Sequence, residues 1–129
     1  METGNAKLVS QAYEAFARRD VAAVMALVDP QIEVRQTELL PWGGTYTGTQ
    51  GLLGFFTRLL SHVDSRVEVE EYIEAGEQVI AIGYTRGEVR QSGRHFDVRL
   101  AHVWTVKDGK LARFEPYVDT PRMLEALAL

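Results

Sequence analysis

His102 is the residue whose type and position are best suited to chemistry. Successive side chains of a strand point to opposite faces, so His102 shares one face with Phe96, Val98, Leu100 and Trp104. We predict that this apolar face points inward, with His102 as its one titratable group. Burial lowers the pKa of a histidine and keeps the ring neutral, with one nitrogen donating and the other accepting. His102 is therefore either a core histidine satisfied by a hydrogen bond, or a group for acid/base chemistry or ligand anchoring.

Tyr13 and Gln36 are the polar residues expected to assist His102. Tyr13 and Phe16 lie one helical turn apart on an apolar stripe, where the Tyr13 hydroxyl can donate beside His102 or the pair can be core. Gln36 shares the inward face of a short strand with Val34. Its carboxamide can hold a water, a ligand carbonyl or a structural hydrogen bond, but it cannot act as a base. We predict His102, Tyr13 and Gln36 as the catalytic residues.

Apolar side chains around these three predict a pocket for a small apolar ligand. Trp42 lies in a loop rich in proline and glycine, where it can close over a ligand or plug the cavity. The other predicted substrate-binding residues lie on inward faces of helices and strands: Phe16, Val34, Phe56, Leu100, Trp104, Phe114, Val118 and Met123.

Helical periodicity predicts the elements that carry the N-terminal part of this pocket. Helices are expected over residues 5–19, over a short segment capped by Asp20 that ends at Asp29-Pro30, and from a Thr49 cap to about Ser61-His62. Near the other end, Thr120 as cap and Pro121 in the first turn predict a short C-terminal helix.

A two-residue period predicts the strands. They are expected over residues 32–36, 66–70, 79–90, 94–106 and 111–119, with a small extended piece at Thr45-Tyr46. Asp108-Gly109 predicts a tight hairpin before the last strand, because glycine tolerates positive φ. The order predicts one α+β domain over residues 1–129, a cone-shaped barrel in which three N-terminal helices pack in a curved antiparallel sheet with a mixed edge.

Composition excludes several functions. A formal net charge of −4 and a single adjacent basic pair, Arg18-Arg19, argue against nucleic-acid binding. The chain has no cysteine, and His95 with Asp97 lacks a third ligand, so we expect no metal site and no cofactor. No apolar stretch approaches the roughly 20 residues of a membrane span. The first residues lack the pattern of a signal peptide, so we expect a cytoplasmic protein without membrane partners.

Four segments resemble the SnoaL-like proteins of the nuclear-transport-factor-two-like superfamily, which includes ketosteroid isomerase and limonene epoxide hydrolase. The segments are YEAFARRD from Tyr13, GTYTG from Gly44, HVWTVKDGK from His102 and YVDT from Tyr117. The resemblance covers nearly the whole chain and implies a cone-shaped fold with a ligand cavity. It also implies a homodimer formed through the outer face of the sheet.

The resemblance does not bring a complete set of catalytic residues. The ketosteroid isomerase tyrosine falls on Ala12, its base on Gln36, and its second acid on Ala101 or His102. The epoxide hydrolase residues fall on Gly83, Thr85 and Pro116. His102 can match the histidine of the SnoaL-type cyclases, but the nearby carboxylates, Glu115 and Asp119, are poor matches for their aspartate because of strand parity. Three functions stay open: an acid/base enzyme of isomerase, cyclase or hydrolase type, a non-catalytic binding domain, and a dimeric association module.

Overall fold

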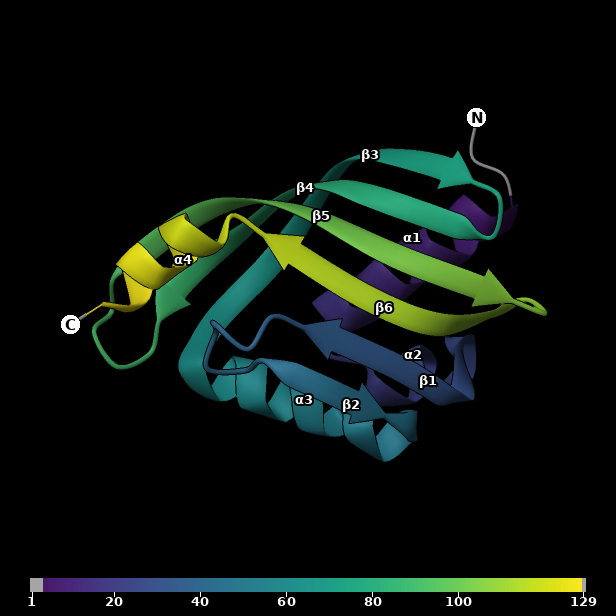
Figure 1. Ribbon diagram of the computed structural model, residues 1–129, viewed down its shortest axis with the longest axis horizontal. Coiled ribbons are helices and arrows are strands. Elements are labelled where there is room, and N and C mark those ends of the chain that lie inside the picture. The colour runs from purple at the N-terminus through teal and green to yellow at the C-terminus, as the bar shows by residue number, and fades with distance from the viewer. Residues whose placement is uncertain (1–3, 129) are drawn as a thin grey trace.

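The computed structural model describes residues 4–128, which form an α+β fold of helices packed against one curved sheet (Figure 1). The helices are α1 (Gly4–Ala17), α2 (Val21–Leu27), α3 (Gly48–His62) and α4 (Thr120–Leu127). The strands are β1 (Val28–Gln36), β2 (Gly44–Thr47), β3 (Val63–Ala75), β4 (Gln78–Val89), β5 (His95–Lys107) and β6 (Lys110–Val118). No helix in this part of the chain is long and apolar enough to cross a membrane.

The sheet has the order β2-β1-β6-β5-β4-β3. Strands β3 to β6 form the predicted antiparallel meander, and β1 joins β6 in parallel, so the sheet is mixed at that side. The Asp108-Gly109 hairpin is confirmed: both residues have positive φ, 50° and 72°, between the paired Lys107 and Lys110. The sheet does not close on itself, and the predicted α+β cone is confirmed.

Close approach of β3 and β4 gives the sheet its bend. A Cβ atom at Gly83 would lie 1.9 Å from the Glu68 carbonyl oxygen, and one at Gly87 would lie 2.0 Å from that of Asp64. The register also shifts by one residue between Val69 and Glu71, as at a β-bulge. Glycine and bulges are the usual means of curving a sheet. The bend wraps β3 and β4 toward the helices and leaves space inside.

The prediction of which β5 side chains face inward is confirmed, because burial alternates along the strand. Val98, Leu100, His102 and Trp104 are each buried, while the residues between them are half-buried or exposed. On β3 the prediction was too short. The strand continues to Ala75. The sequence pattern missed its second half because the bulge reverses which side chains face inward, and this breaks the alternation by which a strand is predicted.

The predicted end of the second helix at Asp29-Pro30 is wrong. The helix ends at Leu27, and Pro30 lies inside β1. Pairing of β1 with β6 is interrupted between Val28 and Glu33, so the missing N–H of the proline costs no ladder hydrogen bond there.

Two predicted helix caps also differ, whereas the Asp20 cap is confirmed by its hydrogen bond to the Ala23 amide, at 3.0 Å. The helix α3 begins at Gly48, and its N-cap is Thr47 rather than Thr49. At α4 the cap is Asp119, whose carboxylate accepts from the Arg122 amide at 3.4 Å, rather than Thr120. In both cases the capping position is filled one or two residues earlier than the residue pattern indicates.

We expect Gly83→Ala to destabilise the protein by about 1–3 kcal/mol, because the new methyl group overlaps the β3 backbone. The matched control is Gly54→Ala on the exposed side of α3, where a Cβ meets no atom within 4 Å. There the gain in helix propensity should raise stability by about 1 kcal/mol. Urea unfolding of both variants measures the difference, and equal midpoints would contradict the role of Gly83 in the bend.

Candidate functional site

An open cavity lies between the concave face of the sheet and the helices. Every predicted site residue except Val34 and Leu100 lines it. Those two are buried in neighbouring parts of the interior, with 0% and 4% of their surface exposed. Phe56 comes from α3, Val118 from β6 and Met123 from α4, so the cavity wall is assembled from the whole chain.

A chain of two hydrogen bonds joins α1 to the sheet at the wall of the cavity. The Trp104 indole N–H donates to the Tyr13 hydroxyl over 2.9 Å, and that hydroxyl lies 2.7 Å from Nδ1 of His102. An indole nitrogen can only donate, so the Tyr13 oxygen accepts there. The Tyr13 hydroxyl has no other hydrogen bond within residues 4–128, so Nδ1 is the one acceptor available for its proton. We therefore assign the proton of the His102 ring to Nε2.

Burial keeps both members of this pair neutral. Only 6% of His102 is exposed, and desolvation lowers its pKa from 6.5 to about 3. Burial likewise raises the pKa of the Tyr13 hydroxyl, an effect that the hydrogen bond from Trp104 partly offsets. At neutral pH the pair is an uncharged phenol and an uncharged imidazole.

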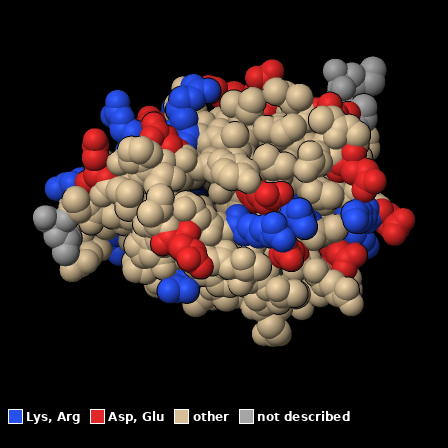
Figure 2. Space-filling view, viewed as in Figure 1, with Lys and Arg blue, Asp and Glu red and all other residues tan. Residues whose placement is uncertain are grey.

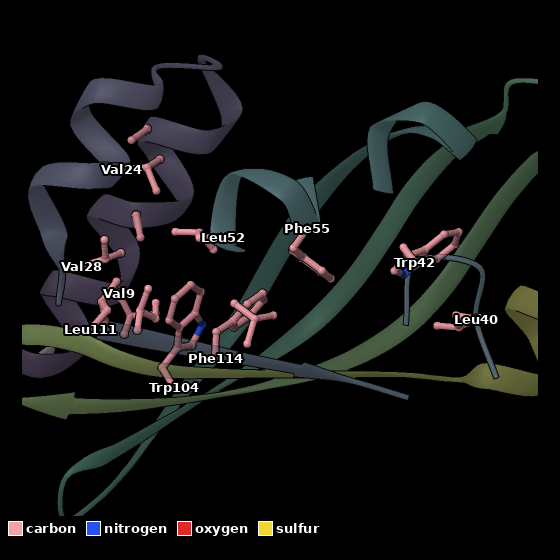
Figure 3. Close-up of a cluster of buried hydrophobic side chains, with 14 of the residues drawn as sticks. Val9, Val24, Val28, Leu40, Trp42, Leu52, Phe55, Trp104, Leu111 and Phe114 are labelled. Carbon is pink, nitrogen blue, oxygen red and sulfur yellow. The ribbon is translucent and has the colours of Figure 1, made fainter. Parts of the chain in front are cut away.

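Aromatic packing fixes the orientation of the histidine ring. The Phe114 ring meets it edge-on, with centroids 5.0 Å apart and an interplanar angle of 88°. Phe114 in turn stacks on Trp104 at 4.1 Å, and Figure 3 shows these two rings side by side on the sheet, facing Leu52 and Phe55 of α3. Such contacts hold the imidazole between the hydroxyl of Tyr13 and the cavity.

The Nε2 atom of His102 is available to a ligand. Its only hydrogen-bond partner in residues 4–128 is on the other nitrogen. Nε2 is not fully enclosed either: within the same residues the one enclosed polar side-chain atom without a hydrogen bond is Arg86 Nε, which is ion-paired with Asp97. The unpaired Nε2–H therefore opens onto the cavity that His102 lines. A neutral N–H at this place can donate to a carbonyl or hydroxyl oxygen. The lone pair on Nδ1 already accepts the hydrogen bond from Tyr13, so the ring has no free lone pair with which to act as a base.

Gln36 and Trp42 line the same cavity. The Gln36 amide donates to the Pro116 carbonyl oxygen at 3.3 Å, so its structural hydrogen bond coexists with a position on the cavity wall. Trp42 is 3% exposed, and its loop is held by the Tyr46 hydroxyl, which donates to the Trp42 carbonyl oxygen at 3.0 Å. Figure 3 shows Trp42 with Leu40 at the opposite end of the hydrophobic cluster from Trp104.

No charged side chain among residues 4–128 lines the cavity. Of the nearby carboxylates, Glu115 accepts a hydrogen bond from the Tyr117 hydroxyl and Asp119 caps α4. Nor do three or more His, Cys, Asp or Glu residues gather anywhere in the described chain as metal ligands would. The described site therefore offers hydrogen bonds from neutral groups, without a carboxylate base beside His102.

Two polar wall residues were missed by the sequence reasoning, namely Ser65 on β3 and Thr85 on β4, each 7% exposed. The signal for them was present, because Ser65 alternates with the inward Val63 and Val67. Thr85 in the same way continues the inward series of Val79 and Ala81.

Most of the positions that the family resemblance singles out lie on this cavity, although Gly83 and Ala101 do not line it. Ala12, Gln36 and His102 line it, and so do Thr85 and Pro116.

Comparison with known proteins agrees with the fold. A family model described as a SnoaL-like domain matches residues 9–114. An NTF2-like protein from Burkholderia thailandensis is 34% identical, with a TM-score of 0.89 over 100% of both chains. An NTF2-like protein of unknown function from Burkholderia pseudomallei is 29% identical, with a TM-score of 0.91 over 99% of this chain and 100% of the other.

TerC, whose structure was determined after co-crystallisation with polyporic acid, is a third relative. It is 26% identical, with a TM-score of 0.88 over 97% of this chain and 98% of its own. Among proteins with curated descriptions, none matches significantly.

The neutral state of His102 predicts a pH dependence of stability. The unfolded histidine binds a proton below its ordinary pKa of 6.5, whereas the folded one does so only near 3. Between these values the unfolded state binds more protons, so stability rises with pH. The contribution is fully present above about 6.5 and is lost as pH falls toward about 3. Urea unfolding of wild type and His102→Gln from pH 4 to 7 should show the extra slope in wild type alone, and parallel curves would contradict it.

Proposed function

We propose that this chain, which belongs to the SnoaL-like family, binds a small, uncharged, largely apolar ring-containing molecule in its cavity and polarises an oxygen of that molecule through His102. One observation carries the proposal. A buried neutral histidine, held by Tyr13 and Trp104, leaves its Nε2–H unpaired at the wall of an apolar cavity. A ligand oxygen is the partner this donor lacks.

The chemistry of the wall sets the class of ligand. Aromatic and aliphatic side chains make up most of the lining, and the described lining contains no charged group. Burying an unpaired charge in such surroundings is strongly unfavourable. Flat apolar rings can pack against the contacting rings of Phe16 and Phe56 and against Trp104, with one oxygen directed at His102. That TerC was co-crystallised with polyporic acid supports small-molecule binding by this chain as well.

A fixed N–H donor also suits catalysis of one kind. Isomerisation, cyclisation and hydrolysis of carbonyl compounds place negative charge on the carbonyl oxygen, and a preorganised donor stabilises that charge. The described wall holds no carboxylate, so the proton acceptor in such a reaction is a water or a group of the substrate itself. A non-catalytic binding domain uses the same contact without turnover.

Ligand binding is tested with wild type, His102→Ala and the control His95→Ala, whose side chain is 85% exposed at the end of β5. The panel contains steroids, terpenoids, aromatic polyketides and small carbonyl compounds. A ligand at 100 times its dissociation constant adds about 2.7 kcal/mol of stability, which thermal shift detects readily. We expect a hit that His102→Ala weakens about tenfold, the effect of a hydrogen bond of about 1.4 kcal/mol, and that His95→Ala leaves unchanged.

Mass spectrometry after long incubation with that hit separates the two functions. A product formed by wild type and not by His102→Ala establishes an enzyme, and unchanged compound establishes a binding domain. A panel without any hit, or a hit indifferent to His102, would contradict the proposal.

The outer face of the sheet supports a second function, association into a homodimer. Ile80, Ile82 and Val103 are half-exposed there, and Ile73 is 41% exposed. Figure 2 shows uncharged surface over part of β4 and β5, next to clusters of charged side chains. Charged residues occupy outer positions along the other half of these two strands: Arg86, Glu88, Asp97 and Arg99. Large exposed apolar patches mark interaction surfaces.

We expect sedimentation velocity to give a dimer for wild type and a monomer for Val103→Arg, because a buried unpaired arginine would separate the two sheets. The control Glu14→Arg lies on the exposed side of α1 and should remain dimeric. Wild type that sediments as a monomer at high micromolar concentration would refute the association.

A further inference from the structure

Ser65 and Thr85 are two buried hydroxyl groups that the His102 contact does not use. Each side chain is 7% exposed and lines the cavity, and neither hydroxyl has a hydrogen bond within residues 4–128. Neither hydroxyl is among the fully enclosed side-chain atoms without a hydrogen bond in the described chain, so both are open to the cavity. Since a buried hydroxyl without a partner is costly, both are poised to bond to whatever fills the cavity.

The register of the sheet places these two hydroxyls together. Thr85 pairs with Val67, and Ser65 lies two residues further along the same face of β3. Diagonal neighbours of this kind have side chains about 7–8 Å apart, which leaves room for one ligand oxygen between them.

The same register places them away from His102. Thr85 pairs with Val98, whereas His102 pairs with Ala81. Four residues of strand separate the two rows, which is about 13 Å at 3.3 Å per residue. The rest of the described cavity lining is mostly apolar, with Phe16, Val67 and Trp104 among its residues.

We infer that Ser65 and Thr85 form a second polar anchor, which binds a hydroxyl or carbonyl oxygen at the far end of an elongated ligand whose other oxygen is bound by His102. This inference rests on the proposed function of the cavity and adds the shape of its ligand. The ligand is an extended, uncharged ring system with an oxygen at each end. A hydroxyl side chain both donates and accepts, so the anchor takes either kind of oxygen.

The test compares two probes of one shape, 4-hydroxybiphenyl and 4,4′-dihydroxybiphenyl, by calorimetric titration. Wild type should bind the dihydroxy compound about tenfold more tightly, as one added hydrogen bond to a buried hydroxyl predicts. In Ser65→Ala/Thr85→Val the two probes should bind alike, because the second oxygen then has no partner. Thr105→Val, on the outer face of β5, is the matched control and should keep the preference.

Stability of the unliganded variant provides an independent readout. Removing two hydroxyls without partners should leave the urea midpoint of Ser65→Ala/Thr85→Val equal to that of wild type or above it. A lower midpoint would show that the hydroxyls serve the fold and would overturn the inference.

The outcomes separate this inference from the proposed function. Equal binding of both probes by wild type, or a preference that survives in the double variant, overturns the second anchor and leaves the His102 contact standing. If wild type binds neither probe, the inference fails together with the proposed ligand class.

Discussion

The hydrogen bonds from Trp104 through Tyr13 to His102 are the interaction on which the site depends. They link α1 to β5 across 89 and 91 residues of sequence, in surroundings where an unpaired polar group is costly. Three side chains bring four polar positions inside: the indole N–H, the hydroxyl and the two ring nitrogens. The first three groups form hydrogen bonds with one another, and Nε2 is left without a hydrogen-bond partner in residues 4–128. The donor that faces the cavity is thus a consequence of how the helix is attached to the sheet.

The shape of the sheet supplies the other condition, which is space. A flat sheet would let α1 and α3 pack directly on β4 and β5 and close the interior. Gly83, Gly87 and the bulge near Val69 instead turn β3 and β4 toward the helices, and the side chains that face inward there are small or polar. Curvature therefore leaves Ser65 and Thr85 on the wall of the cavity, rather than in a filled core.

Local patterns predicted much of this arrangement. Alternation on β5 correctly predicted that His102 and Trp104 share an inward face, and the helical period put Tyr13 inward. Neither pattern gives a distance between elements, so the contact of Tyr13 with His102 stayed a hypothesis until the strands were placed. Alternation predicts which side chains of a strand face the interior, but it does not predict which part of the interior is packed and which part is cavity. Val34 and Leu100 are therefore buried without lining the cavity. Pro30 misled the helix prediction because its missing N–H is harmless at an interruption in strand pairing.

The most direct test of the central claim is nitrogen-15 NMR of the His102 ring, which distinguishes a protonated ring nitrogen from an unprotonated one. The hydrogen-bond chain predicts a proton on Nε2 and none on Nδ1, unchanged from pH 5 to 8. A proton on Nδ1, or a charged ring anywhere in that range, would contradict the assignment of a neutral donor facing the cavity.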